Sequence, residues 1–289
     1  MRPFDIPPPP TTAIGAIAEA LGPFATETTV VIGLSCLAAQ ILFALLFAKV
    51  LPHGPWTAEP GYTAHQAVCL PLMVYMAYTG CATWFGTVSY PSAESRVLAL
   101  HMDGIYLAQV AFCELLFWDI PVGLAVASMR EPVMLAHHFG MLAAAAGGVS
   151  LNSYYGKFFF GACELTSVFL VICDLFHPKH KAWAALAEAS PTLSALNNAM
   201  RGIFVLCYML LRAIYFPYIV LSGLVPDVLE ILTRPITSRN GASDAALLAP
   251  GIIGVCMVGL QWYWGYLLVQ QLRKMLSPMQ EGESKSKKA

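Results

Sequence analysis

Two adjacent histidines, His137 and His138, lie within the apolar stretch EPVMLAHHFGMLA. A polar ring that leaves water must find hydrogen-bond partners, because burying it without them costs free energy. A histidine beside a carboxylate can act as a general base toward a hydroxyl or an amine, as acyl transfer requires. Neighbouring positions on a helix differ by about 100°, so both rings cannot point at one centre. We therefore expect one ring to face a cavity and the other to bond a neighbouring helix.

Further ionisable residues lie inside apolar segments long enough to cross a membrane. Such residues are rare in lipid, usually face a protein interior or a watery cavity, and mark a functional site by default. The set comprises eight residues: His101, Asp103, Glu114, His137, His138, Glu164, Asp174 and Arg212. This number exceeds what packing alone requires. We take His137, His138 and Glu164 as the candidate catalytic residues.

Helical spacing indicates which other polar side chains share a face with this set. Asp103 and Glu114 are eleven residues apart and lie on one helix face. His138 and Asn152 lie within about 40° of each other on the same helical projection. We therefore expect Asp103, Glu114 and Asn152 to line the same ligand cavity as the histidines.

Arg212 completes the predicted cavity set. A guanidinium keeps its proton, so in the middle of a membrane it requires a carboxylate or a path to the interface. Glu164 and Glu114 are the expected partners. The alternative to a ligand-binding role is a buried ion network that only fixes how the helices pack.

No metal site is predicted. Membrane di-iron oxygenases need repeated HxxHH boxes, whereas this chain has seven histidines, a single HH pair and one isolated HxxH at His177 and His180. The histidine and carboxylate set could instead perform acyl transfer, or form the polar floor of a lipid-binding cavity in which no reaction occurs.

The composition requires a membrane setting for these residues. Of the 289 residues, 57% are hydrophobic and 11% are charged, whereas a soluble domain carries about a quarter charged residues. The net charge of −1 argues against nucleic acid as a partner. About 20 apolar residues span a bilayer, and seven segments qualify: 28–51, 66–89, 97–118, 133–152, 157–176, 199–225 and 247–272. The prediction is an all-α, multi-pass helical bundle.

The C-terminal tail EGESKSKKA indicates the orientation and the compartment. Lys285 and Lys287 fit the KxKxx dilysine signal that returns membrane proteins to the endoplasmic reticulum and works only in the cytosol; the alternative is a solvated basic tail. With the tail in the cytosol, ten basic residues lie on that side and five on the other, in agreement with the positive-inside rule. We therefore expect an endoplasmic reticulum membrane protein with a cytosolic C-terminus.

Five stretches of the chain carry a resemblance to a known family; in chain order they are MDGIYLAQVAFCELLFWD, EPVMLAHHFGM, GKFFFGACELTSVFLVICDLF, MRGIFVLCYMLLRAIYFPYI and LQWYWGYLLVQQLRKML. Together they resemble the TLC domain, a family named for the translocation-associated membrane protein, the ceramide synthase subunits and a neuronal ceroid lipofuscinosis protein. The synthase motif opens with HH and has an asparagine fourteen residues later, as His138 and Asn152 do here. The synthases continue with His-Asp and Ser-Asp pairs, where this chain has Cys163-Glu164 and Thr166-Ser167. ELTSVFL is similar to the ELS-x-FL signature of TLC branches outside the synthases.

The resemblance implies six helices around a lipid-accessible cavity. The expected organisation is an irregular lead-in over 1–27, an extra span and loop over 28–64, the TLC domain over 65–275 and a disordered basic tail over 276–289. The expected function is binding or handling of acyl lipids, which affects membrane lipid homeostasis. The first alternative is an acyltransferase related to ceramide synthase that takes acyl-CoA as co-substrate. The second is a non-enzymatic cargo or scaffold protein. Membrane lipids are the expected partners, and no cofactor is expected.

Overall fold

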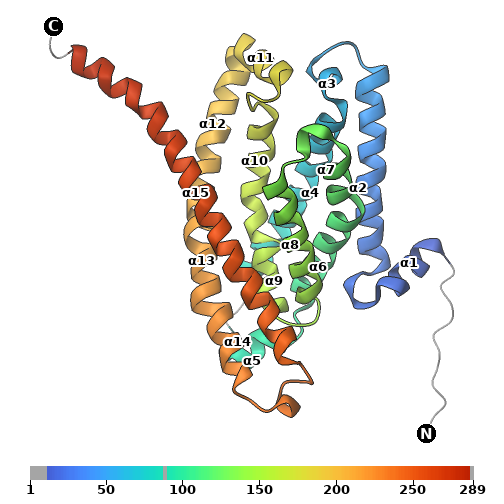
Figure 1. The fold of residues 1–289 in the computed structure, drawn as a ribbon. Helices are drawn as coiled ribbons and strands as arrows, with labels where there is room; N and C mark the ends of the chain where they lie inside the picture. Colours follow the sequence, from blue (N-terminus) through green and yellow to red (C-terminus); the bar gives the residue numbers. More distant parts are fainter. Residues whose placement is uncertain (1–11, 87–89, 287–289) are drawn as a thin grey trace.

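A computed structural model of the chain describes residues 12–86 and 90–286. Within these ranges the chain is helical and contains no strand. Figure 1 shows an elongated bundle in which α1 lies near one end and the C-terminal part of α15 extends beyond the other. The ends of the described chain thus lie at opposite ends of the bundle. The helices are α1 (Ala13–Leu21), α2 (Glu27–Leu45), α3 (Pro55–Ala58), α4 (Pro60–Phe85), α5 (Ala93–Val97), α6 (Met102–Glu114), α7 (Ile120–Ala125), α8 (Pro132–Gly148), α9 (Ser153–Phe159), α10 (Leu165–Leu175), α11 (Lys181–Ala189), α12 (Pro191–Cys207), α13 (Phe216–Ile219), α14 (Val225–Leu232) and α15 (Asp244–Ser286).

Helices cover most of the described part of each of the seven predicted spans, and six helical runs of the described chain are long and apolar enough to cross a membrane. These runs are Glu27–Val50, Pro60–Phe85, Ala93–Ala125, Ser153–Leu175, Pro191–Leu232 and Asp244–Lys274. The remaining predicted span, 133–152, corresponds to α8, which has 17 residues. At 1.5 Å per residue α8 is about 26 Å long, slightly less than the hydrocarbon core of about 30 Å. The two histidines of α8 also lower its hydropathy.

The chain outside the spans differs from expectation at both ends. Part of the predicted irregular lead-in forms α1, where the Thr12 side chain accepts a hydrogen bond from the backbone N–H of Gly15 at 2.9 Å. Ile14, Ile17 and Leu21 recur at helical spacing and pack against the start of α2. At the other end, α15 continues to Ser286 and so extends a helix into the predicted disordered tail.

Turns of π-helix interrupt several of the long helices. One covers Leu115–Asp119 between α6 and α7, and two others, Tyr208–Tyr215 and Val220–Leu224, flank α13. Pro217 of α13, which has no backbone N–H to donate to a helix hydrogen bond, lies between these two wider turns. In a π turn the hydrogen bond joins residues i and i+5, so side chains five positions apart lie nearly above one another. Glu114 and Asp119 are five positions apart and therefore share a side of the helix.

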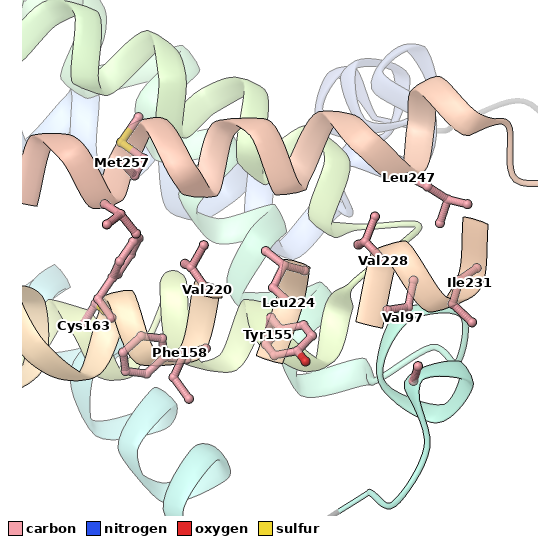
Figure 2. Packing of buried hydrophobic residues seen from close by; sticks show 14 of the residues in the cluster. Val97, Tyr155, Phe158, Cys163, Val220, Leu224, Val228, Ile231, Leu247 and Met257 are labelled. Carbon is pink, nitrogen blue, oxygen red and sulfur yellow. The ribbon is translucent and has the colours of Figure 1, made fainter. Parts of the chain in front are cut away.

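The apolar core consists mainly of two large clusters of buried side chains, one of which is shown in Figure 2. In Figure 2, Tyr155 and Phe158 of α9, Val220, Leu224 of the turn after α13, and Met257 of α15 gather between the helices. In another part of the bundle, glycine permits a close approach: a Cβ on Gly80 of α4 would overlap the backbone that leads into α10. These contacts fix α4, α9 and α10 around the polar residues described next.

Candidate functional site

A cavity of about 460 Å³ lies among α4, α6, α8, α10, α12 and α15. Five of the seven predicted site residues that lie within spans line this cavity: Glu114, His137, His138, Glu164 and Arg212. Apolar side chains form much of the remaining wall: Met73, Met76, Ala111, Leu115, Met134, Leu135, Met141, Phe160, Leu170, Val171, Phe204, Leu267 and Leu268. One enclosure thus combines ionisable groups with an apolar lining.

His138 is held by a carboxylate that sequence reasoning missed. Its Nδ1 lies 2.8 Å from Oδ2 of Asp119, and Oδ1 of Asp119 lies 2.7 Å from Nε2 of His65. All three side chains line the cavity. Asp119 is 7% exposed and His65 8% exposed. Because Nδ1 of His138 is occupied by Asp119, Nε2 is the ring nitrogen left for a ligand, and the carboxylate fixes the orientation of the ring.

We call His138, Asp119 and His65 the His138 clamp. Local structure positions Asp119 and His65 within it. The π turn Leu115–Asp119 brings Asp119 to the cavity side of its helix. The preceding residue, Trp118, stacks on the His65 ring with centroids 4.8 Å apart and donates a hydrogen bond from Nε1 to Oε1 of Gln40 at 3.3 Å. Gln40 in turn donates to the backbone carbonyl of Gly61 at 2.8 Å. This chain of contacts joins α2, α4 and the end of α6, so the His65–Asp119 pair has little freedom.

His137 also lines the cavity but has different contacts. Its ring packs edge-on against Trp264 of α15, with centroids 5.3 Å apart. Its Nδ1 is buried without a hydrogen-bond partner among the described residues. The expected division, with one ring toward the cavity and the other bonded to a neighbouring helix, is therefore incorrect: both rings line the cavity, and His138 is the one that is also bonded to another segment.

Arg212 forms the opposite side of the polar site. Its Nη2 lies 3.4 Å from both carboxylate oxygens of Glu164, and donates to Oγ of Ser167 at 3.1 Å and to the carbonyl of Cys163 at 3.2 Å. Its Nε donates to Oγ1 of Thr166 at 2.6 Å. The prediction that Arg212 pairs with a spanning carboxylate is confirmed, with Glu164 as the partner.

Glu114 differs from the other carboxylates deep in the cavity. It is 6% exposed and lines the cavity. Asp119 is bonded to two histidines, and Glu164 accepts from Arg212 and from Oγ of Ser167 at 2.6 Å. No described residue forms a hydrogen bond or an ion pair with the Glu114 side chain.

At the end of the cavity near α11, polar residues replace the buried network. Asp174 accepts from the Tyr62 hydroxyl at 2.8 Å and from Gln66 at 3.4 Å, and lies 3.5 Å from Nζ of Lys179. All four of these residues line the cavity. This end lies on the same side of the bundle as the C-terminal part of α15 (Figure 1).

Two predicted cavity residues lie elsewhere. Asp103 is exposed in the first turn of α6. It is eleven residues from Glu114, so the shared helix face is real but the rise of about 1.5 Å per residue separates the two along the axis by about 16 Å. Asn152 follows the end of α8 in a left-handed conformation, with φ of 60°, so its helical projection from His138 does not apply. It lines a separate cavity of about 50 Å³, and both polar side-chain atoms of Asn152 are buried without partners in the described chain.

The residues of the predicted retrieval signal are only partly described. Lys285 belongs to the C-terminal end of α15. Lys287 lies outside the described residues.

Comparison with known families identifies the domain that contains the cavity. A family model of the TLC domain, covering the TRAM, LAG1 and CLN8 proteins, matches residues 61–270. The match contains all the residues of the His138 clamp and of the Arg212 network. No curated protein and no solved structure matches the chain.

Proposed function

Since the chain belongs to the TLC domain family of membrane proteins, we propose that it binds an acyl lipid in the cavity and so affects the lipid composition of the endoplasmic reticulum membrane. The acyl chain packs against the apolar wall. The polar end of the lipid meets His137, His138 and Glu164.

The observation that carries this proposal is the composition of the cavity lining. Methionine, leucine and phenylalanine side chains share the enclosure with three histidines, three deeply placed carboxylates and an arginine. The volume of about 460 Å³ falls within the range of about 300–1,000 Å³ that is typical of small-molecule sites. An apolar wall with a few convergent polar groups matches an amphipathic ligand.

Lipid analysis of the purified protein tests this proposal. Full-length protein is purified in detergent, and co-purifying lipids are extracted and identified by mass spectrometry. Ala111 lines the cavity, so Ala111→Phe should exclude the lipid by occupying its volume. Ala136→Phe, on the exposed surface of α8, adds the same ring outside the cavity and should retain the lipid. Equal retention by both folded variants would refute binding at this place.

The contact between His138 and Asp119 supports acyl transfer as a second candidate function. A carboxylate on Nδ1 orients the imidazole and favours it as a general base at Nε2. In this reaction the acceptor hydroxyl or amine attacks the thioester carbonyl of acyl-CoA and gives its proton to Nε2 of His138. The carbon–sulfur bond then breaks, and the CoA thiolate takes that proton. Lys179 at the polar end of the cavity, or Arg212, would orient the acyl-CoA.

Incubation with palmitoyl-CoA distinguishes the two candidates. Release of CoA thiol that depends on His138 supports acyl transfer. Bound acyl lipid without CoA release supports binding alone. A purified protein with neither property would support the cargo or scaffold alternative, in which the polar network serves only to pack the helices.

A further inference from the structure

Asn152 has a buried side chain for which the described protein provides no partner. It is 4% exposed, and both its Oδ1 and its Nδ2 are buried without a hydrogen bond in the described chain. Asn152 directly precedes α9, where an asparagine side chain normally accepts a hydrogen bond from a backbone N–H of the first turn. The Asn152 side chain makes no such bond. Because an amide taken out of water without partners is unfavourable, this side chain indicates a ligand.

The backbone of Asn152 does not explain why an amide is buried here. Its N–H donates to the carbonyl of Val97 at 2.8 Å, and its carbonyl accepts from the N–H groups of Tyr155 at 2.9 Å and Gly156 at 3.3 Å. These bonds hold the residue with φ of 60°, a conformation that glycine adopts readily and without burying a polar side chain. The amide therefore needs a reason of its own.

The Asn152 side chain belongs to the wall of the cavity of about 50 Å³. Residues of α8, α9, α13, α15 and the turn after α13 form this wall, and Tyr155 and Met257 among them are labelled in Figure 2. Met141 and Phe160 line both this cavity and the large one, so these two side chains separate the cavities. The small cavity is thus a place of its own.

The lining determines which ligand fits the small cavity. Among the described residues, no charged side chain lines it, and the hydroxyl of Tyr155 is already bonded to Asp227. An ion would therefore be buried without a counter-charge, which is strongly unfavourable. The Asn152 amide donates and accepts hydrogen bonds, so a matching group does both. A water molecule takes about 30 Å³ in the liquid, so this volume has room for only about two or three heavy atoms.

We propose that the small cavity is a second binding site, in which the Asn152 amide holds the hydroxyl group of a small neutral molecule. The hydroxyl donates to Oδ1 and accepts from Nδ2. Its source is water or an alcohol of the size of ethanol, whose alkyl end contacts the apolar wall. The inference does not depend on the proposed function, because the large cavity and its polar network take no part in it.

Nuclear magnetic resonance of the asparagine side chains tests this site. The chain has four asparagines, Asn152, Asn197, Asn198 and Asn240, so full-length deuterated protein with nitrogen-15-labelled asparagine, in deuterated detergent, gives four side-chain amide signals. Asn152→Gly removes one signal and so assigns it, because glycine tolerates this backbone conformation. The Asn152 amide protons should show a nuclear Overhauser cross-peak to bound water or, after addition of ethanol, to the ethanol methyl protons.

The cross-peaks distinguish the two sources of the hydroxyl group. A water cross-peak that ethanol does not replace supports the site with water as its ligand. Replacement of that cross-peak by one to the ethanol methyl protons supports the site with an alcohol as its ligand. If the Asn152 amide shows neither cross-peak, the site is refuted.

Ala144→Leu and Ala143→Leu are the matched variants. Ala144 lines the small cavity, whereas Ala143 is exposed on the same helix. Ala144→Leu should fill the cavity and abolish the cross-peak, and Ala143→Leu should keep it. Equal effects in the two folded variants would overturn the location of the site. The signals of the other three asparagines report whether each variant is folded, and the wild-type cross-peak decides the proposal if Ala144→Leu does not fold.

Discussion

Asp119→Ala is the substitution that most directly tests the structure of the polar site. The side chain is 7% exposed and holds two rings, His65 at 2.7 Å and His138 at 2.8 Å. Alanine leaves both ring nitrogens without this partner. Each buried polar atom deprived of its partner costs about 1–3 kcal/mol, so we expect a loss of about 2–6 kcal/mol in the free energy of unfolding. His65 suffers most, because its Nδ1 already has no partner in the described chain.

His65→Phe is the control for this prediction. Phenylalanine can keep the stacking on Trp118, whose centroid lies 4.8 Å from that of His65, and Asp119 keeps its bond to His138. One contact is lost in place of two, so the expected loss is about 1–3 kcal/mol. Denaturant titrations in mixed micelles measure both values. If Asp119→Ala destabilises the protein no more than His65→Phe, the carboxylate does not hold the two histidines as the geometry requires.

Three further predictions concern the histidine pair, the arginine and the tail. His138→Ala should lower the amount of lipid retained per folded protein, whereas His137→Ala should lower the stability of the protein through lost packing on α15. Lipid extraction normalised to the amount of folded protein measures the difference. Equal lipid retention by the two folded variants would contradict this prediction. Arg212→Met should reduce the free energy of unfolding by about 3–5 kcal/mol, because it leaves a buried carboxylate unpaired; a loss below about 1 kcal/mol in denaturant titration would show that the ion pair is dispensable. Changing Lys285 and Lys287 together to serine should release the protein from the endoplasmic reticulum in fluorescence microscopy, and unchanged localisation would remove the retrieval signal.

Hydropathy predicts the spans and most of the polar site for one physical reason. Ionisable residues are too unfavourable in lipid to occur there by chance, so each one inside an apolar segment is a candidate site residue on the strength of the sequence alone. Glu114, His137, His138, Glu164 and Arg212 are identified in this way and line one cavity. Charge alone predicts that Arg212 pairs with Glu164 or Glu114, and the structure selects Glu164.

The same reasoning misses His65 and Asp119 because it stops at the ends of the predicted spans. Asp119 follows the segment 97–118 directly, and His65 precedes 66–89 directly. The helical run that contains Asp119 in fact continues to Ala125, and the one that contains His65 begins at Pro60. The apolar residues IPVGLA after Asp119 are the available signal. A charged residue at a predicted span end should therefore be included in the candidate set when apolar sequence follows it.

Helical projection fails where the helix is not a regular α-helix or where it ends. The segment Leu115–Asp119 is a π turn. A projection at 100° per residue assumes a regular α-helix and therefore does not predict where its side chains point. Projection to Asn152 crosses the end of α8 at Gly148. Projection to Asp103 gives the correct face but ignores depth. Rotation about a helix axis thus predicts which residues share a face, and position along the axis decides which of them share a site.

The pattern of pairing in the cavity distinguishes a packing network from a binding site. A network that only fixes helix packing is most stable when each buried charge and each polar ring atom has a partner, because every unpartnered group is unfavourable. Arg212 and Asp119 meet this condition. Glu114, Nδ1 of His137 and Nδ1 of His65 do not have partners in the described chain, and all three residues line the cavity. Incomplete pairing among residues of the lining is what a site prepared for a polar ligand requires, and an apolar residue of similar size in place of Glu114 should stabilise the protein while lowering lipid retention.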